Sequence, residues 1–225
     1  MSAQNKSRKQ LRLRVLAVAM LVVGCLLLTV GALGVYDYFS VKSEGADLPS
    51  NEAVTSDAVV PSENKPAEIS TGYVVPAGQP RVIEIPSISV EAYVQRVGIT
   101  PQGAMATPNN IYFTGWYVNS VGPGEQGLSI INGHVGGRYS PGIFENLKNT
   151  KQGEKIRVQM GDLSWREFEI TSVNTYPVEE SGEALFDDDP TVDSELHLIT
   201  CEGNYNSQSD TYDQRVIVVA KRLNN

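Results

Sequence analysis

The chain has 225 residues, a formal net charge of −8 at pH 7 and a hydrophobic content of 41%. This length and apolar content allow at least one folded domain with a core of its own. The acidic balance disfavours nucleic acid or an anionic membrane surface as the partner of that domain.

The first residues predict a membrane anchor. Residues 1–14 carry basic side chains and no acidic one, and residues 15–35 contain no charged side chain. An uncharged apolar stretch of this length can span a bilayer as a helix, and a basic flank stays in the cytoplasm. We therefore predict a cytoplasmic tail at 1–14, a single transmembrane helix at 15–35 and an extracytoplasmic remainder. A cleaved signal peptide is the alternative, although its apolar core is usually shorter.

Residues 36–80 differ in composition from the rest of the chain. They are rich in Ser, Ala, Glu and Pro and show no sustained apolar periodicity. Such composition is typical of a disordered, extended segment. We predict an extracytoplasmic stalk at 36–80, followed by one folded domain at 81–225.

Residues 81–225 show mainly strand patterns. In "KIRVQM" the apolar Ile156, Val158 and Met160 alternate with polar residues, which is the period of a half-buried strand. The turn sequence "GDLS" follows and predicts a hairpin. Eight strand-like segments are expected in all, at 81–85, 92–97, 111–115, 127–133, 155–160, 166–173, 195–201 and 215–220. This spacing predicts a closed or nearly closed β-barrel, with a short helix at 142–149.

Cys201 is the only cysteine in the predicted extracytoplasmic part, because Cys25 lies in the apolar span. The domain therefore cannot form an internal disulfide. A lone thiol in an oxidising compartment calls for an explanation. It can be a nucleophile, a small buried apolar group or a partner in an intermolecular disulfide.

A cysteine nucleophile needs a base or a neighbouring cation, and the chain has 2 histidines. His197 precedes Cys201 by four residues, about 13 Å along a strand, so we predict a surface residue that cannot reach the thiol. His134 ends an apolar run and lies among glycines. Strand ends before glycine-rich turns often present functional side chains. His134 is therefore the candidate base, and an ordinary turn histidine is the alternative.

Arg215 opens the last apolar run of the chain. If this run pairs with the one that ends at Cys201, the polar loop at 202–214 covers one end of the sheet and the guanidinium lies near the thiol. A guanidinium can hydrogen-bond a substrate carbonyl or stabilise an oxyanion. An ordinary charge at a strand end is the alternative.

The segment 179–195, "EESGEALFDDDPTVDSE", is dense in carboxylates. We predict a solvated acidic loop. Calcium held by several carboxylate oxygens is the alternative. No cofactor or metal is expected for the chain.

Four stretches together resemble one protein family. "LITC" at 198–201, Arg215 after a polar loop, "NGHVGG" at 132–137 and "RVIEIPSISV" at 81–90 are similar to the sortases, membrane-anchored cysteine transpeptidases of bacterial cell surfaces. The resemblance covers 81–225. It implies a mainly β fold, an eight-stranded sortase-type barrel with one or two short helices. It also implies His134, Cys201 and Arg215 as catalytic residues, with Thr200 helping to hold the substrate and the oxyanion.

One position departs from the family pattern, and two stretches indicate a class within the family. The position four residues before the cysteine is usually Thr in sortases and is His197 here. The stretches 105–127 and 198–205 are closest to class E and F sortases, and no aromatic-acidic lid motif precedes the barrel.

The resemblance also implies a reaction and a location. Cys201 would cleave an LPxTG-like C-terminal sorting signal between Thr and Gly, and an amine of a cell-wall precursor, a pilin-like protein or another surface protein, or else water, would resolve the acyl-enzyme. The enzyme, a thiol protease and acyltransferase, would sit in a bacterial plasma membrane with its N-terminus in the cytoplasm.

Two other classes of protein remain as alternatives. One is a non-catalytic receptor or adhesion module with a buried Cys201. The other is a peptidoglycan transpeptidase, which would carry a Ser-x-Gly-Cys motif where this chain has Ile199 and Thr200 before the cysteine.

Overall fold

The computed structural model describes residues 20–36, 38, 48–56, 60–66, 68–208 and 211–223. The chain divides into two compact units, Met1–Ser40 and Val41–Asn225. In the first unit, residues 20–36 form a helix. Among the described residues, no helix combines the length and apolar character needed to cross a membrane. The predicted tail at 1–14 and the first part of the predicted span, 15–19, lie outside the described residues.

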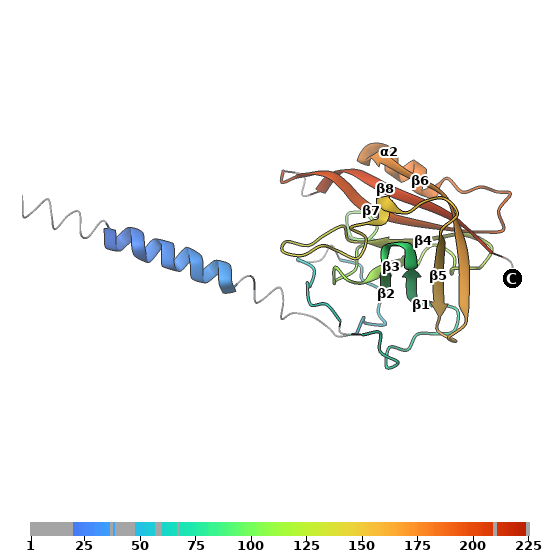
Figure 1. The fold of residues 1–225 in the computed structure, drawn as a ribbon, viewed down its shortest axis with the longest axis horizontal. Helices are drawn as coiled ribbons and strands as arrows, with labels where there is room; N and C mark the ends of the chain where they lie inside the picture. Colours follow the sequence, from blue (N-terminus) through green and yellow to red (C-terminus); the bar gives the residue numbers. More distant parts are fainter. Residues whose placement is uncertain are drawn as a thin grey trace, which may run out of the picture. The chain divides into compact units, whose positions relative to one another are not determined.

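The second unit contains a closed barrel of eight strands, which confirms the predicted architecture (Figure 1). The order around the barrel is β1-β2-β3-β4-β7-β8-β6-β5. The elements along the chain are β1 (Pro80–Ile85), the 3-10 helix η1 (Pro86–Ile88), β2 (Val90–Val97), β3 (Thr114–Tyr117), β4 (Gly127–Gly133), the 3-10 helix η2 (Leu147–Asn149), β5 (Lys155–Met160), β6 (Trp165–Pro177), α2 (Val178–Phe186), β7 (Ser194–Asn206) and β8 (Thr211–Arg222).

Two strand pairs are parallel, β2 with β3 and β4 with β7, and the other neighbours are antiparallel. The barrel interior is filled by apolar side chains that alternate along the strands, among them Ile131, Phe168, Leu198 and Val218. Because side chains alternate along a strand, the remaining side chains of β4, β7 and β8 point to the outside of the barrel.

The predicted period-2 pattern of residues 155–160 is confirmed. Ile156, Val158 and Met160 are buried in β5, and the residues between them are not. The β5–β6 hairpin closes through "GDLS" as expected, with Gln159 opposite Trp165. Inside the turn the Asp162 carboxylate accepts the Ser164 N–H at 2.9 Å.

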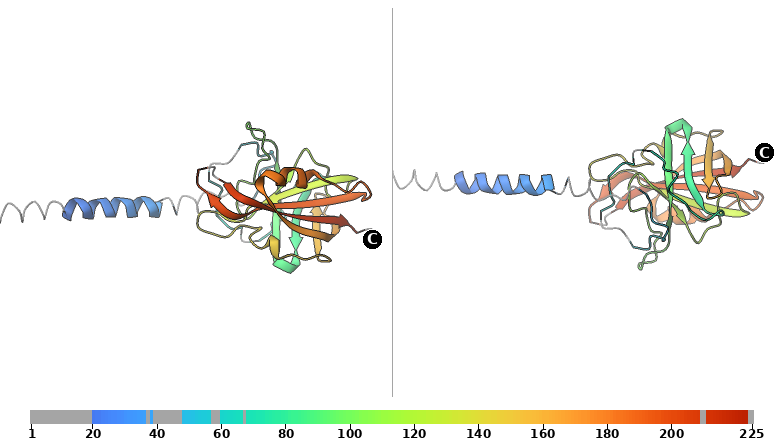
Figure 2. Two further views of the ribbon diagram at one scale, coloured as in Figure 1. Left: turned by 90° about the horizontal axis from the view of Figure 1, so that it is seen from above. Right: turned by 90° about the horizontal axis from the view of Figure 1, so that it is seen from below.

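Three local predictions differ from the structure. β3 lies at 114–117 rather than 111–115, because residues 111–113 form turns. Residues 142–149 form turns and the short η2 rather than an α-helix, although Phe144 and Leu147 are buried as the pattern required. The acidic segment is not simply a loop, since its first part is the helix α2, which packs Leu185 against Ile130 and Ile217 on the outside of the barrel. The view from above in Figure 2 shows α2, in orange, lying across the strands of this face.

Parts of the segment predicted as a disordered stalk pack on the barrel. The Val54 N–H donates to the Arg96 carbonyl at 2.9 Å, and its own carbonyl accepts the Gly98 N–H at 2.7 Å. Tyr73 and Val75 are buried in a cluster with Tyr93 and Phe113. The composition missed these contacts because a few widely spaced apolar residues are enough to dock a segment that has no periodic pattern. The folded unit therefore begins before the predicted boundary at residue 81.

Candidate active site

The β7–β8 hairpin places Cys201 directly opposite Arg215. Residues opposite each other in an antiparallel pair point to the same face, with Cβ atoms roughly 4.5–5.5 Å apart. The side-by-side pairing assumed from the sequence is therefore confirmed. The predicted loop at 202–214 is wrong, because β7 continues to Asn206 and β8 already begins at Thr211. The hairpin arms thus extend beyond the cysteine.

Strand β4 brings His134 to the other side of Cys201. β4 runs parallel to β7 with Asn132 paired to Ile199, and two further residues along each chain lead to His134 and Cys201. The register is tied at this point because the Thr200 hydroxyl donates to the Gly133 carbonyl at 2.8 Å. The register thus places Cys201 between Arg215 on β8 and the end of β4, which His134 directly follows.

A backbone carbonyl orients the His134 ring. His134 Nε2 lies 2.8 Å from the Pro108 carbonyl oxygen. A carbonyl can only accept a hydrogen bond, so Nε2 carries the proton and Nδ1 is left as the basic nitrogen of the neutral ring. Burial lowers the pKa of His134 from its ordinary 6.5, and the bond to Pro108 raises it by a smaller amount. The imidazole is therefore neutral at pH 7.

Asn132 is a residue of the site that sequence reasoning did not single out. Its side-chain amide donates to the Ala106 carbonyl at 2.8 Å, two residues before the Pro108 carbonyl that holds His134. Asn132 and His134 lie two residues apart, so they share the outward face of this strand run. The available signal was the "NGH" spacing, which sets two polar side chains on one face at the end of an apolar strand.

Cys201 is a free thiol of intermediate exposure. Burial raises its pKa above the ordinary 9.0, and the positive charge of Arg215 lowers it by a smaller amount. The thiol is therefore protonated at neutral pH, beside a neutral imidazole. Its partial exposure argues against the alternative of a thiol fully enclosed in the core.

The Arg215 guanidinium is held by its own hairpin. One terminal nitrogen, Nη1, donates to the carbonyls of Tyr212 at 2.9 Å and Gln214 at 2.8 Å, and Nη2 donates to the Thr211 hydroxyl at 2.8 Å. These bonds use the planar fork of the guanidinium, which a lysine ammonium cannot reproduce. Arg215 is thus a positive charge fixed beside the thiol rather than a freely moving strand-end residue.

Two residues differ from their predicted environments. The Thr200 hydroxyl is buried and already donates to Gly133, and it points to the face opposite that of Cys201, so it cannot hold a substrate oxyanion. His197 was predicted at the surface and is fully buried, with Nδ1 2.8 Å from the Leu185 carbonyl. Helix α2, which the acidic composition concealed, covers it.

The acidic segment forms no metal site within the part of the chain that the structure describes. Two of its carboxylates, those of Asp189 and Glu195, have local partners. Asp189 accepts the Thr191 N–H at 2.9 Å and the Thr191 hydroxyl at 2.7 Å, and these bonds lower the pKa of Asp189. Glu195 accepts the Asp189 N–H at 2.9 Å.

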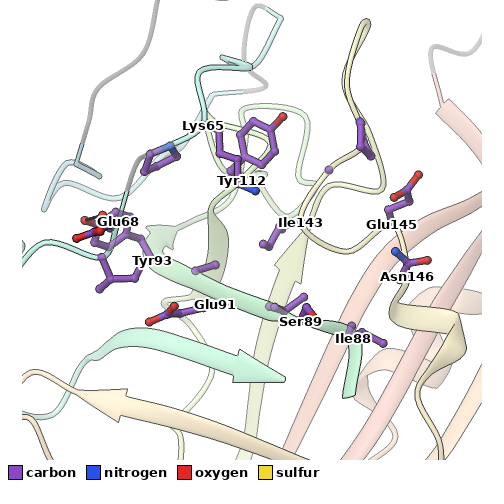
Figure 3. Close-up of a pocket in the computed structure, with 16 residues that line it drawn as sticks. Lys65, Glu68, Ile88, Ser89, Glu91, Tyr93, Tyr112, Ile143, Glu145 and Asn146 are labelled. Atoms are coloured by element: carbon purple, nitrogen blue, oxygen red, sulfur yellow. Dashed lines mark hydrogen bonds between the residues drawn. The ribbon is translucent and has the colours of Figure 1, made fainter. Parts of the chain in front are cut away.

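A cavity of about 370 Å³ lies beside the site but does not include the catalytic candidates (Figure 3). It is lined by residues 65, 66, 68 and 69, by the start of β2 and by residues of the segment 141–146. The last of these touches the site, because the Phe144 N–H donates to the His134 carbonyl at 2.9 Å. The cavity is therefore adjacent to the backbone of His134 and not to the thiol.

Comparison with known proteins agrees with the barrel fold. A family model described as the sortase domain matches residues 83–223. Sortase A from Corynebacterium diphtheriae, in a lid mutant, superposes with a TM-score of 0.50 and 22% identity over 67% of this chain and 72% of that one. Sortase C from Streptococcus pneumoniae superposes with a TM-score of 0.51 and 17% identity over 68% of this chain and 72% of that one. A search of curated proteins found no match.

Proposed function

Because this chain belongs to the sortase family, we propose that it is a membrane-anchored transpeptidase that cleaves an LPxTG-like sorting signal between Thr and Gly. It then transfers the new C-terminus to an amine of the cell wall or of another surface protein. The observation that supports this proposal is the strand register, which lines up His134, Cys201 and Arg215 on one outward face.

The first half of the reaction makes a thioester. The Cys201 thiol gives its proton to Nδ1 of His134, and the sulfur attacks the carbonyl carbon of the substrate Thr. The carbonyl oxygen becomes an oxyanion, which Arg215 stabilises by charge and directed hydrogen bonds. The C–N bond breaks, and the imidazolium of His134 returns the proton to the leaving Gly amine.

The second half of the reaction resolves the acyl-enzyme. A neutral amine attacks the thioester carbonyl, and the C–S bond breaks. The amine loses a proton through His134, and the same proton restores the Cys201 thiol. Water can replace the amine, in which case the product is a free carboxylate and the outcome is hydrolysis.

We also propose the location that the N-terminal residues predict. The basic tail at 1–14 stays in the cytoplasm, and the uncharged stretch at 15–35 crosses the plasma membrane of a bacterium once. In intact cells, an external protease should remove a tag at the C-terminus and leave a tag at the N-terminus untouched. Protection of both tags, or recovery of a secreted protein that starts near residue 40, would contradict this topology.

The test of the reaction uses the purified full chain and a panel of fluorescence-quenched sorting peptides, with mass spectrometry of the products. Cys201→Ala should abolish both peptide cleavage and the covalent acyl adduct, while the matched control Cys25→Ala should keep both. His134→Ala should lose nearly all turnover. Absence of any adduct on Cys201 across the panel would favour a non-catalytic receptor or adhesion module instead.

A further inference from the structure

Residues 60–66 lie outside the part of the chain that matches the sortase family model, yet they run beside the site. Ser62 forms a parallel bridge with Asn110. Its N–H donates to the Asn109 carbonyl at 2.8 Å, and its carbonyl accepts the Ile111 N–H at 2.9 Å. The Asn110 side chain donates to the Asn64 carbonyl at 2.9 Å. This segment is thus docked on the residues that directly follow Pro108.

Glu63 turns from the same segment to the loop that follows His134. Its carboxylate accepts the Arg138 N–H at 2.6 Å and the Tyr139 N–H at 3.0 Å. Glu63 is 1% exposed, and hydrogen bonds accepted by a carboxylate that is shielded from water are among the stronger ones in proteins. Gly137 makes the approach possible, because a Cβ there would lie 2.6 Å from a Glu63 carboxylate oxygen.

The loop held by Glu63 is coupled to His134 through short backbone bonds. The Gly137 N–H donates to the Ser140 carbonyl at 2.8 Å, and the Gly142 N–H donates to the Val135 carbonyl at 3.0 Å. A side chain at Gly142 would collide with the His134 carbonyl. Because these contacts are tight, we expect a shift of residues 137–139 to shift the backbone of His134 as well.

Both supports of the His134 ring consequently depend on residues 62–64. One support is the Pro108 carbonyl, whose following residues are bonded to Ser62 and Asn64. The other is the glycine-rich loop bonded to Glu63. We propose that Glu63 is a positioning residue of the active site, which fixes the ring of His134 relative to Cys201. This inference rests on the proposed function, in which His134 moves the proton.

The test compares variants of the full chain in the peptide cleavage assay. Glu63→Ala removes the carboxylate that holds the N–H groups of Arg138 and Tyr139, so kcat should fall on the order of tenfold to a hundredfold while KM changes little. Glu63→Gln keeps one carbonyl oxygen as acceptor and should fall between the wild type and Glu63→Ala. The matched control is Glu68→Ala, an exposed carboxylate outside this segment, which should stay within about twofold of the wild type.

The pH dependence separates positioning from stability alone. Once the loop loosens, water reaches the His134 ring, so the acid limb of kcat/KM should move toward the ordinary histidine pKa. A variant that only lost stability would melt at a lower temperature with an unmoved acid limb and unchanged kcat, and this result would overturn the proposal. If Glu63→Ala does not fold, the same comparison is made with Glu63→Gln.

Failure of the proposed function has a different signature. In that case the wild type itself cleaves no peptide and forms no adduct on Cys201. If the wild type is active, and neither Glu63→Ala nor Glu63→Gln changes kcat or the acid limb, then only the proposed role of Glu63 is rejected.

Discussion

At the scale of single residues, the protonation states of His134 and Cys201 dominate the chemistry. Burial lowers the pKa of His134 and raises the pKa of Cys201, so both groups are neutral at pH 7. The reactive thiolate and imidazolium pair is then a minor form of the enzyme. It is most populated when the two groups share one proton between them.

This sharing sets the pH dependence of catalysis. Below the lowered pKa of His134 both groups are protonated, and the imidazole cannot accept the thiol proton. Above the raised pKa of Cys201 both have lost their protons, and none remains for the leaving amine. We expect a bell-shaped kcat/KM profile, with its acid limb below 6.5 and its alkaline limb above 9.0. Peptide cleavage measured across this pH range checks the profile, and an acid limb above pH 7 would contradict it.

Arg215 has two separable effects on the reaction. Its charge lowers the pKa of Cys201, and its fork is anchored to the hairpin by directed hydrogen bonds. Arg215→Lys should keep most of the first effect and lose kcat by on the order of 10²–10³, because an ammonium cannot reproduce the fork. Arg215→Ala should in addition raise the pKa of the thiol. Alkylation of Cys201 by iodoacetamide as a function of pH measures that pKa, and a near-normal kcat for Arg215→Lys would reduce Arg215 to a general charge.

The sequence allowed the three central residues to be found because the choices were few. The predicted extracytoplasmic part has one cysteine and two histidines, and the extended geometry of a strand set His197 aside. The supporting groups were beyond such reasoning. The Pro108 carbonyl has no side-chain signal, and Glu63 lies in a segment whose composition resembles that of any exposed linker. Only the fold shows that the Pro108 carbonyl bonds the His134 ring and that Glu63 bonds the loop after His134.

At the scale of elements, the β7–β8 hairpin carries a bulge directly after the cysteine. The register shifts between Glu202 and Tyr205, and Gly203 has a φ of +85. The Asp213 carboxylate accepts the Asn204 N–H at 2.8 Å and occupies the space where a Gly203 side chain would lie. The bulge therefore depends on this glycine, and it sets how the hairpin leaves the Cys201–Arg215 pair.

Gly203→Ala should consequently damage the site locally. The left-handed backbone and the contact with Asp213 together should destabilise the hairpin by about 1–2 kcal/mol or more, and kcat should fall with it. Gly153→Ala is the control, because Gly153 has a φ of +87 with open space around its Cβ position and lies away from the site. It should lower the melting temperature without changing kcat. Equal kcat values for the two variants would show that the bulge does not shape the site.

The elements with the clearest apolar and polar pattern were the ones that the sequence predicted best. β5 alternates strictly between apolar and polar residues and was placed at its observed bounds. α2 escaped prediction because the segment 179–195 as a whole is dense in carboxylates, which predicted a solvated loop, and the burial of Leu185 against Ile130 and Ile217 comes from the tertiary fold. The hairpin arms beyond Cys201 are polar on both faces, so they carried no alternating signal.

At the scale of the whole molecule, residues before the barrel contribute to its stability. Tyr73 and Phe113 each pack edge-on against Tyr93, at ring centroid distances of 5.2 Å and 5.6 Å. The buried Arg81 side chain donates to the Tyr73 carbonyl at 2.8 Å and to Gln159 at 2.6 Å. Removal of residues 41–80 would expose this cluster and leave the guanidinium without two of its acceptors, the carbonyls of Ser70 and Tyr73.

A chain of residues 81–225 should therefore be much less stable than a chain of residues 41–225. Burial of a large apolar side chain contributes about 1.5–3 kcal/mol, and Tyr73 and Val75 would both be lost. Urea unfolding followed by fluorescence measures the difference as a lower midpoint for the shorter chain. Coincident unfolding curves would mean that the N-terminal segment rests on the barrel without stabilising it.

The parallel pairing of β4 with β7 has a consequence for the kinetics of folding. Its partners, such as Leu128 with Glu195, are separated in the chain by β5, β6 and α2. Such long-range contacts form slowly, in milliseconds to seconds, whereas the local β7–β8 hairpin can close within about 1–10 μs. During refolding, Cys201 should meet Arg215 early and His134 late. Cleavage activity should then return with the slowest refolding phase, and until that phase the thiol is paired with its cation but has no base.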